Sequence, residues 1–561
     1  GEWLAELERQ RRAVQISVAG AHRWIAAEDA GLYRDALGAA GPGGLPDAFL
    51  QPVERPMEVL LRRFARHHGP FVTRAAASRY GLREAQVEPE LRALEAAGTL
   101  LRGEIRPGGA ELDWCDAEIL RRLKRRTLAR LRDAVAPVDT PTLALFLPQW
   151  HGLDEPRAGQ QRLAEVIAQL QGLALPWSLL STVLLPRRVP GFQLDMLDML
   201  AASGAVVWVG RGASGPRDGR VALYTRRQVK QLLSAARDFE APSPLHQAIL
   251  DCLEGQGASF LLEIEDFVRA QAGEVTGREL RDALWDLVWA GQLTNDTFAP
   301  LRALGRSPAR PSRRRATDRI ASGRWSLVSQ LVPDEPDLTV QAVARVNLLL
   351  ERYGVVSRDC AAAEDLPGGF SPLYKVLKEM EDQGRVRRGY FVEGLSGAQF
   401  AHVGAVDRLR ACRQDAEERD RPLHAEDIAM LPVMEPANPY GGMVAWPKAA
   451  NPDKAKPRRV PGAWLLLARG RPVLYVAPRS RSLISFPDLL RDEPDALGVA
   501  LQALRLLPRA ARRGPLTIDR IDGAPAAESS LLAAFRAAGF ELDYRGLIDI
   551  QAPGVTAIGD R

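Results

Sequence analysis

Apolar residues recur at helical spacing in four stretches of the chain, and a glycine follows each stretch. An apolar residue lies four positions before each glycine and a leucine lies seven positions before it. This is the spacing of the buried stripe of an amphipathic helix. A glycine at the end of such a helix can adopt the left-handed conformation that closes it. The pattern therefore indicates one structural unit repeated four times, with its closing glycines at Gly98, Gly204, Gly291 and Gly384.

The residues around each repeat predict a winged helix. Another helical run precedes each repeat and ends at an upstream glycine, and strand-like runs follow three of the four closing glycines. The second repeat is clearest, because "AVVWV" (205–209) and "RVALYT" (220–225) flank a turn rich in glycine and proline. Helix, strand, two helices and a hairpin is the order of a winged helix-turn-helix. A plain array of glycine-capped helices would leave the paired strands unexplained. The upstream glycines are Gly69, Gly172, Gly257 and Gly354.

The fold class expected from this pattern is α+β and mostly helical, with tandem winged-helix modules followed by a small antiparallel β-barrel or sheet. The last part alternates apolar strands, Trp464–Ala468 among them, with turns rich in arginine and glycine. The expected divisions are a helical lead-in and linker at the end of a helicase core (1–55), winged helices (56–115, 161–230, 244–330 with a basic loop, and 340–415), connecting helices (116–160), and a β-barrel-like module with a terminal helix (425–561).

Composition is that of a globular protein with several domains. The chain has 561 residues, of which 46% are hydrophobic and 26% are charged. A net charge of +5 is weak evidence for a polyanionic partner. The four cysteines are too far apart in sequence to suggest a zinc site or a disulfide framework. No apolar run reaches membrane-spanning length and no signal peptide is visible, so a cytoplasmic location is expected. Because the chain starts at Gly1 without a methionine, we expect it to be a piece of a longer protein.

Three basic clusters are candidates for phosphate contacts. One lies on the predicted helix 117–134, one lies in the loop 302–324, and one lies on the wing of the fourth repeat. The alternatives are a solvated or subunit-facing helix for the first cluster and a solvated linker for the second. The third repeat has arginines at its predicted recognition helix, but that helix is so apolar that we expect it to be buried. The candidates are Arg121, Arg122, Lys124, Arg125 and Arg126, then Arg313, Arg314 and Arg315, and finally Arg385, Arg387 and Arg388.

Several long stretches are specific enough to carry a resemblance to a known family. They are "RWIAAEDAGLYRDALG" (23–38), "LFLPQWHGL" (145–153), "ALWDLVWAGQLTNDTFAPLRAL" (283–304), "GRWSLV" (323–328), "LLLERYGVVSR" (348–358) and "GRVRRGYFVEGLSGAQFA" (384–401). Together they resemble the C-terminal region of bacterial large helicase-related (Lhr) proteins.

The resemblance implies a function for the whole parent protein. Members are DNA-dependent ATPases of DNA repair that translocate 3′ to 5′ and unwind duplexes, RNA–DNA hybrids included. Their C-terminal region has tandem winged helices and a β-barrel and drives oligomer assembly. No G-x-x-x-x-G-K-[ST] phosphate loop occurs in this chain. We therefore expect ATP and magnesium to bind in a helicase core outside it, and no cofactor to bind within it.

The resemblance also extends to a winged-helix class of bacterial DNA glycosylases. These position water with a Gln-apolar-Gln or Gln-apolar-Asp element, for which Gln149 and His151 around Trp150 are an imperfect match. The alternative is a structural Pro-Gln-Trp corner. Asp543 and Asp549 are the other candidate bases beside a flipped nucleotide. The alternative is that both are ordinary aspartates on the solvent face of a strand, without a catalytic role.

Three functions follow from these candidates. The first is assembly of a homo-oligomer, a tetramer or larger, that guides single-stranded or forked DNA, or an RNA–DNA hybrid, away from a helicase motor. The second is excision of uracil or damaged bases by a DNA glycosylase. The third is an oligomerisation scaffold without DNA contact. We expect at most one or two of the four winged helices to bind DNA.

Overall fold

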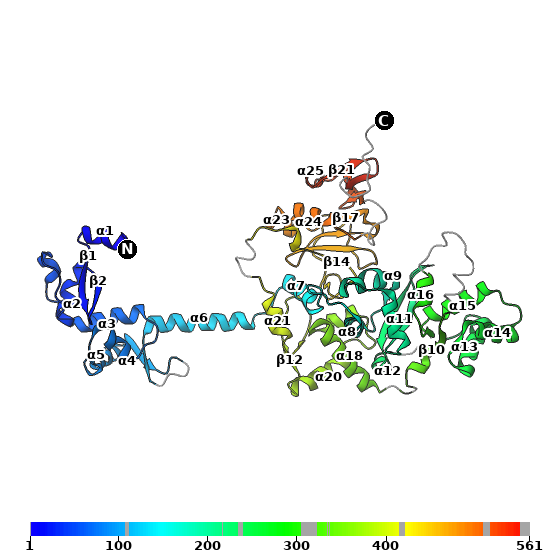
Figure 1. Cartoon of the computed structure of the whole chain (residues 1–561), viewed down its shortest axis with the longest axis horizontal. Helices are drawn as coiled ribbons and strands as arrows, with labels where there is room; N and C mark the ends of the chain where they lie inside the picture. Colours follow the sequence, from blue (N-terminus) through cyan, green and yellow to red (C-terminus); the bar gives the residue numbers. More distant parts are fainter. Residues whose placement is uncertain are drawn as a thin grey trace. The chain divides into compact units, whose positions relative to one another are not determined.

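The structure is a computed structural model that describes residues 2–549 except 107–110, 216, 234–238, 305–321, 334, 336, 415–420 and 509–515. The chain divides into two compact units, unit 1 (Gly1–Ala136) and unit 2 (Pro137–Arg561). Figure 1 labels many of the elements along the chain. Within the described residues, no helix is both long enough and apolar enough to span a bilayer.

Unit 1 contains a β-hairpin within residues 1–55, where only a helical lead-in and a linker were expected. The hairpin pairs β1 (Ala13–Val18) with β2 (Ala21–Ala26), and it lies between two short helices, α1 (Glu2–Arg9) and α2 (Ala30–Leu37). Alternate residues of β1 are buried, so one face of the hairpin packs on the core of the unit. Unit 1 ends with the long helix α6 (Ala117–Val135).

The four predicted repeats share one order of elements, which is helix, strand or bridge, two helices and a hairpin. In modules 2, 3 and 4 the short first strand joins the wing, and the three strands lie in the order first, third, second. In module 1 an isolated bridge between Phe71 and Trp114 takes the place of the first strand. The elements of module 1 are α3 (Pro56–His67), α4 (Thr73–Tyr80), α5 (Glu84–Ala96), β3 (Leu100–Gly103) and β4 (Asp113–Asp116). Those of module 2 are α8 (Gln160–Leu170), β5 (Leu175–Pro176), the continuous helical segment α9–η3–α10 (Trp177–Leu179, Leu180–Leu184, Leu185–Arg188), α11 (Leu194–Ala202), β6 (Val206–Ala213) and β7 (Gly219–Thr225).

Modules 3 and 4 repeat this order. Module 3 contains α13 (Pro244–Gln256), β8 (Ser259–Phe260), α14 (Leu261–Ala272), α15 (Gly277–Trp289), β9 (Leu293–Asn295) and β10 (Arg324–Leu327). Module 4 contains α18 (Leu338–Tyr353), β11 (Val355–Val356), α19 (Arg358–Ala363), α20 (Ser371–Asp382), β12 (Val386–Gly389) and β13 (Gln399–His402).

The closing glycines behave as the sequence predicts. Gly98, Gly204, Gly291 and Gly384 all have positive φ, between 68° and 74°. That conformation is strained for any residue with a Cβ, so glycine is favoured at each of these helix ends. Among the upstream glycines, Gly172, Gly257 and Gly354 also have positive φ, whereas Gly69 does not.

The recognition helix of module 3, α15, packs on the wing of module 2. A methyl group on Gly219 would overlap the ring of Trp289, and one on Gly210 would overlap the backbone carbonyl of Val288. Thr294 fixes the contact from β9 by donating its hydroxyl to the carbonyl of Trp208, a residue that is fully buried. Two glycines in the wing therefore allow the backbone of module 2 to approach a helix that carries large aromatic side chains.

The last module is an open sheet, and the expectation of a barrel is not supported. Its main sheet has six strands in the order β14-β15-β16-β17-β19-β20, and all neighbours are antiparallel except β17 and β19. A separate three-stranded sheet has the order β18-β22-β21. The described residues show no pairing between the edge strands β14 and β20 that would close a barrel. The strands are β14 (Ile428–Pro432), β15 (Trp464–Ala468), β16 (Arg471–Val476), β17 (Ser482–Ser485), β18 (Thr517–Ile518), β19 (Arg520–Ile521), β20 (Ala524–Pro525), β21 (Phe540–Asp543) and β22 (Gly546–Asp549), and the helices are α23 (Pro487–Asp492), α24 (Ala496–Arg505) and α25 (Leu532–Ala537).

Strand β15 is buried on both faces, which explains its continuous apolar run. Trp464 and Leu466 belong to a core that includes residues of modules 2 and 3 and of α24. Leu465 and Leu467 belong to a second core, which includes residues of module 4 and of α7 (Thr140–Trp150). Because side chains alternate along a strand, one strand joins both cores of unit 2.

We predict that Gly219→Ala destabilises unit 2 by about 1–3 kcal/mol, because the added methyl group must displace the Trp289 ring in a packed interface. Thermal unfolding followed by tryptophan fluorescence measures the effect. The matched control is Gly255→Ala in α13, where a methyl group would meet nothing within 4 Å and should not lower the midpoint. Equal midpoints for the two variants would contradict the packing of α15 on the wing.

Candidate nucleic-acid interface

Three of the four recognition helices are poorly suited to bind DNA. In module 3 the apolar face of α15 is buried, as expected, with Leu287 and Val288 fully inaccessible. In module 2, Asp198 of α11 forms an ion pair with Arg302 of α16 (Ala299–Leu304) and accepts a hydrogen bond from the Phe298 backbone. In module 1, α5 carries four glutamates and one arginine, and the arginine pairs with Glu88. An acidic helix repels phosphates, so module 1 lacks a favourable reading surface.

Module 4 differs because its recognition helix and wing both expose cations. Lys375 and Lys378 lie one turn apart on α20, and both are exposed. The three acidic residues of α20 fall in its last four positions, whereas a recognition helix in the major groove contacts base edges with its N-terminal residues. The described residues offer no acidic ion-pair partner to any of these cations. We call this surface the module 4 basic face, and it consists of Lys375, Lys378, Arg385, Arg387 and Arg388.

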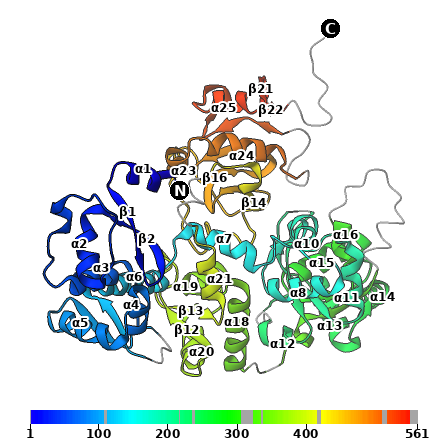
Figure 2. The ribbon, with the colours of Figure 1, turned by 60° about the vertical axis from the view of Figure 1, so that its left-hand side comes forward.

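The wing of module 4 holds its arginines on two sides. Side chains alternate along β12, so Arg388 lies on the same side as buried Val386 while Arg387 lies on the other. The guanidinium of Arg388 lies 5.9 Å from the ring centroids of Tyr374 on α20 and Phe400 on β13. These rings hold one cation where the helix and the wing meet. Figure 1 places α20 and β12 at the end of unit 2 opposite the C-terminal module, and Figure 2 agrees.

The basic cluster on α6 is exposed to solvent. The helix begins after Asp116, whose carboxylate accepts hydrogen bonds from the backbone N–H groups of Glu118 and Ile119. Arg121 forms an ion pair with Glu118 at 3.0 Å, and the side chains of Arg122, Lys124, Arg125 and Arg126 are likewise exposed. A solvated helix face and a phosphate-binding face both fit these contacts. Arg313, Arg314 and Arg315 lie outside the described residues.

Gln149 and His151 lie together at the end of α7 and line a cavity of about 440 Å³. His151 is only 1% exposed. Its Nδ1 lies 3.1 Å from Nη2 of Arg188, and Arg188 in turn binds both carboxylate oxygens of the buried residue Glu435. Trp150 donates its indole N–H to the backbone carbonyl of Glu351, so the Pro-Gln-Trp corner also has the structural role that was weighed against catalysis.

The contacts of His151 define its protonation. Burial, together with the Arg188 charge, lowers the pKa of His151 to about 3, so the imidazole is neutral. Because a guanidinium only donates, Nδ1 must accept and the proton must sit on Nε2. That Nε2 has no hydrogen-bond partner among the described residues. His151 is therefore suited to donate a hydrogen bond and unsuited to act as a general base.

The sequence did not point to Glu351, the carboxylate that shares this cavity. It lies near the end of α18, and partial burial raises its pKa. Its place near the end of a predicted helix carried no chemical signal. The same is true of the Arg188–Glu435 pair, whose members are 247 positions apart in the sequence. The described residues contain no group of three or more His, Cys, Asp or Glu side chains that could hold a metal ion.

Asp543 and Asp549 lie elsewhere, and neither lines this cavity. In the β21–β22 hairpin, Asp543 faces Gly546 and Asp549 faces Phe540, so the two aspartates are at opposite ends. Asp549 is buried and forms an ion pair with Arg505 at 3.1 Å, while Asp543 accepts a hydrogen bond from the backbone of Arg545. Both carboxylates thus have structural contacts.

Family models of winged-helix domains of large helicase-related proteins match three parts of the chain. The model of the second such domain matches residues 1–52, the third matches 138–226, and the fourth matches 335–421. The chain belongs to the large helicase-related (Lhr) family. The hairpin β1–β2 therefore falls in a segment that matches a winged-helix domain of the family.

Two curated Lhr proteins are similar over nearly the whole chain. The "Lhr helicase/ probable uracil glycosylase" of Mycolicibacterium smegmatis is 39% identical over 545 residues, which cover 93% of this chain and 35% of that protein. The "Lhr helicase/uracil glycosylase" of Escherichia coli is 33% identical over 587 residues, which cover 97% of this chain and 37% of that protein. The chain thus spans about a third of the length of these relatives.

A solved structure shows a weaker likeness. Streptomyces sahachiroi DNA glycosylase AlkZ superimposes with a TM-score of 0.40 at 15% identity, over 69% of this chain and 100% of that one.

We predict that His151 makes this Lhr chain sensitive to mild acid. A folded-state pKa near 3 lies below the usual 6.5, so the unfolded state binds more protons between these values and stability falls as pH drops below 6.5. Between pH 7 and pH 5 the loss should be about 2 kcal/mol. The pKa of Glu435 is lowered to about 2, so its contribution is lost only below about pH 4.5.

The comparison uses His151→Asn, whose side-chain oxygen can still accept from Arg188 but does not titrate. Urea midpoints at pH 7 and pH 5 should differ less in this variant than in the native chain. An identical acid shift in both proteins would assign the pH dependence to other groups.

Proposed function

We propose that this chain is a non-motor region of an ATP-dependent 3′ to 5′ DNA helicase of DNA repair, and that it guides DNA leaving the motor. The module 4 basic face is the observation that carries this proposal. The membership of the Lhr family and the winged-helix modules support it. The other modules of unit 2 act as a scaffold that fixes the orientation of this face.

The proposed contact is electrostatic and follows from the geometry of module 4. Helix α20 approaches a groove or a displaced strand with Lys375 and Lys378, and the wing arginines bind the neighbouring phosphates. Each neutralised phosphate releases condensed counterions, which makes binding depend steeply on salt. Tyr374 and Phe400 keep Arg388 in place between helix and wing, so less side-chain freedom is lost on binding.

We predict that Lys378→Glu and Arg387→Glu each weaken DNA binding at low salt. Each should also reduce the slope of log K against log salt by about 1, because one phosphate contact is lost. Fluorescence anisotropy with single-stranded and forked oligonucleotides measures both quantities. The control is Arg278→Glu in module 3, which makes the same charge change at an exposed arginine that pairs with Asp282. Slopes that are unchanged in all variants would place the DNA elsewhere, with α6 the next surface to test.

Assembly of a homo-oligomer, a tetramer or larger, is part of the same proposal and rests on the family resemblance. We expect light scattering of the 561-residue chain to give a multiple of its 61.4 kDa mass. The mass of a single chain across micromolar concentrations would contradict assembly.

A second candidate function is excision of uracil from DNA. The names of the two relatives and the cavity at the end of α7 favour it. In this scheme a flipped nucleotide enters the cavity, and Glu351 takes a proton from a water molecule held by Gln149. The water oxygen bonds to the sugar C1′ as the C1′–N bond breaks, and the departing base keeps that electron pair and takes up a proton.

We predict that Glu351→Gln lowers cleavage of uracil-containing oligonucleotides by about 100-fold or more, as loss of a general base does. Abasic sites, revealed by heating in alkali, measure the activity. The matched control is Glu541→Gln, at an exposed position on β21. No uracil release by the native chain, or equal release by both variants, would remove this candidate.

A further inference from the structure

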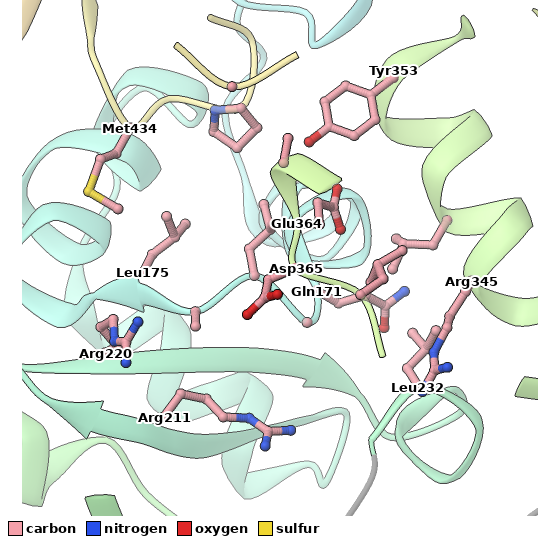
Figure 3. Close-up of a pocket in the computed structure, with 18 of the residues that line it drawn as sticks. Gln171, Leu175, Arg211, Arg220, Leu232, Arg345, Tyr353, Glu364, Asp365 and Met434 are labelled. Atoms are coloured by element: carbon pink, nitrogen blue, oxygen red, sulfur yellow. The ribbon is translucent and has the colours of Figure 1, made fainter. Parts of the chain in front are cut away.

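A cavity of unit 2 lies where modules 2 and 4 meet the C-terminal module, and it encloses about 510 Å³. Figure 3 shows the wing strands of module 2 along one side and α18 along another. It is distinct from the cavity at His151, with which it shares none of its lining residues. Its size is that of a site for a small organic ligand.

Four arginines from three structural elements line this cavity. Arg211 and Arg220 come from the wing of module 2, Arg345 comes from α18, and Arg459 comes from the segment before β15. Arg211 donates to the hydroxyl of Tyr224 at 3.2 Å, whereas the described residues offer Arg220 no acidic partner. Figure 3 shows Arg211, Arg220 and Arg345 around one space. Such convergence of guanidinium groups on separate elements is typical of anion binding.

The local acids do not balance these cations. Glu364 forms an ion pair with Arg352, which is not one of these four arginines. Arg459 is held by three backbone carbonyls, those of Glu435, Asn438 and Tyr440, and burial lowers its pKa. The side chain of Glu435 is already bound to Arg188. Asp365 is the remaining carboxylate of the lining. A largely buried cation held by neutral groups is stabilised when an anion enters.

Part of the remaining wall of the cavity is apolar. It includes Leu173, Leu175 and Met434, with the ring of Tyr353 nearby (Figure 3). A purely inorganic anion would leave this surface uncovered, whereas a flat organic group would bury it. The lining thus combines a cationic part with an apolar part, which matches a ligand that has both a phosphate and a ring.

We propose that this cavity binds a nucleoside phosphate, with its phosphate on Arg211, Arg220 and Arg459 and its base against the leucine and methionine wall. Two ligands present a nucleoside phosphate, a free mononucleotide and the 5′-phosphorylated end of a DNA strand. The proposal is independent of the module 4 basic face, because the cavity and that face share no residue.

The test measures binding of dTMP, ATP, inorganic phosphate and a short oligonucleotide with and without a 5′-phosphate, by calorimetry on the full chain. Arg220→Glu should weaken binding of the nucleoside phosphate at least tenfold. Ala363→Trp, at an exposed lining position on α19, should weaken it similarly by filling the cavity without changing charge. The control is Arg227→Glu, at an exposed position after β7 that does not line the cavity.

The outcomes separate the two sources. Tighter binding of dTMP or ATP than of phosphate, lost in both cavity variants, identifies a free nucleotide. Binding that requires the oligonucleotide 5′-phosphate, and is lost in the same variants, identifies a strand end. No binding of any probe, or losses as large in Arg227→Glu as in Arg220→Glu, overturns the proposal. Lys378→Glu, which should weaken DNA binding, should leave binding of dTMP and ATP unchanged. The nucleotide-binding proposal and the DNA-guidance proposal can therefore be contradicted separately.

Discussion

The packing of α15 on the wing of module 2 decides which surfaces of this chain remain available. Trp289 fits over Gly219 because glycine has no side chain, and the carbonyl of Val288 approaches Gly210 for the same reason. This contact buries the apolar face of α15 and one side of the module 2 wing at once. A winged helix whose recognition helix is buried in this way has a structural role in the fold.

The two hydrophobic cores of unit 2 also join its modules to one another. Strand β15 contributes Trp464 and Leu466 to one core and Leu465 and Leu467 to the other. The Arg188–Glu435 pair adds a buried ionic contact between module 2 and the C-terminal module, and His151 accepts from the same guanidinium. Removal of one member of such a pair leaves an uncompensated buried charge. The modules of unit 2 are therefore joined by a continuous interior, and the exposed face of module 4 is held by it.

The repeats could be predicted from the sequence because their signal is local. A stripe at helical spacing and a glycine such as Gly384 are read within a dozen residues, and the positive φ of that glycine confirms the prediction. The apolar character of α15 likewise predicted its burial. The hairpin at 13–26 was missed because its strands are followed at once by a helical pattern. The barrel was not supported because strand pairing is non-local: β17 pairs with β19, and the intervening residues include α23 and α24.

The candidate sites were less predictable. The wing arginines of module 4 stand out in sequence, and Lys375 and Lys378 could have been added from their spacing on the same predicted helix. Nothing in the sequence joins Glu435 to Arg188, or Arg459 to Arg220, because tertiary packing alone brings these residues together. His151 illustrates the limit most clearly. Its identity suggested a base, but the guanidinium at its Nδ1 leaves it a donor.

We propose that packing between modules leaves module 4 as the surface that contacts DNA. Hydrogen–deuterium exchange of the full chain with and without a forked oligonucleotide tests it most directly. The expected result is slower exchange in α20 and β12–β13 on DNA binding, with α11 and α15 unchanged. Protection in α11 or α15, with none in α20, would contradict it.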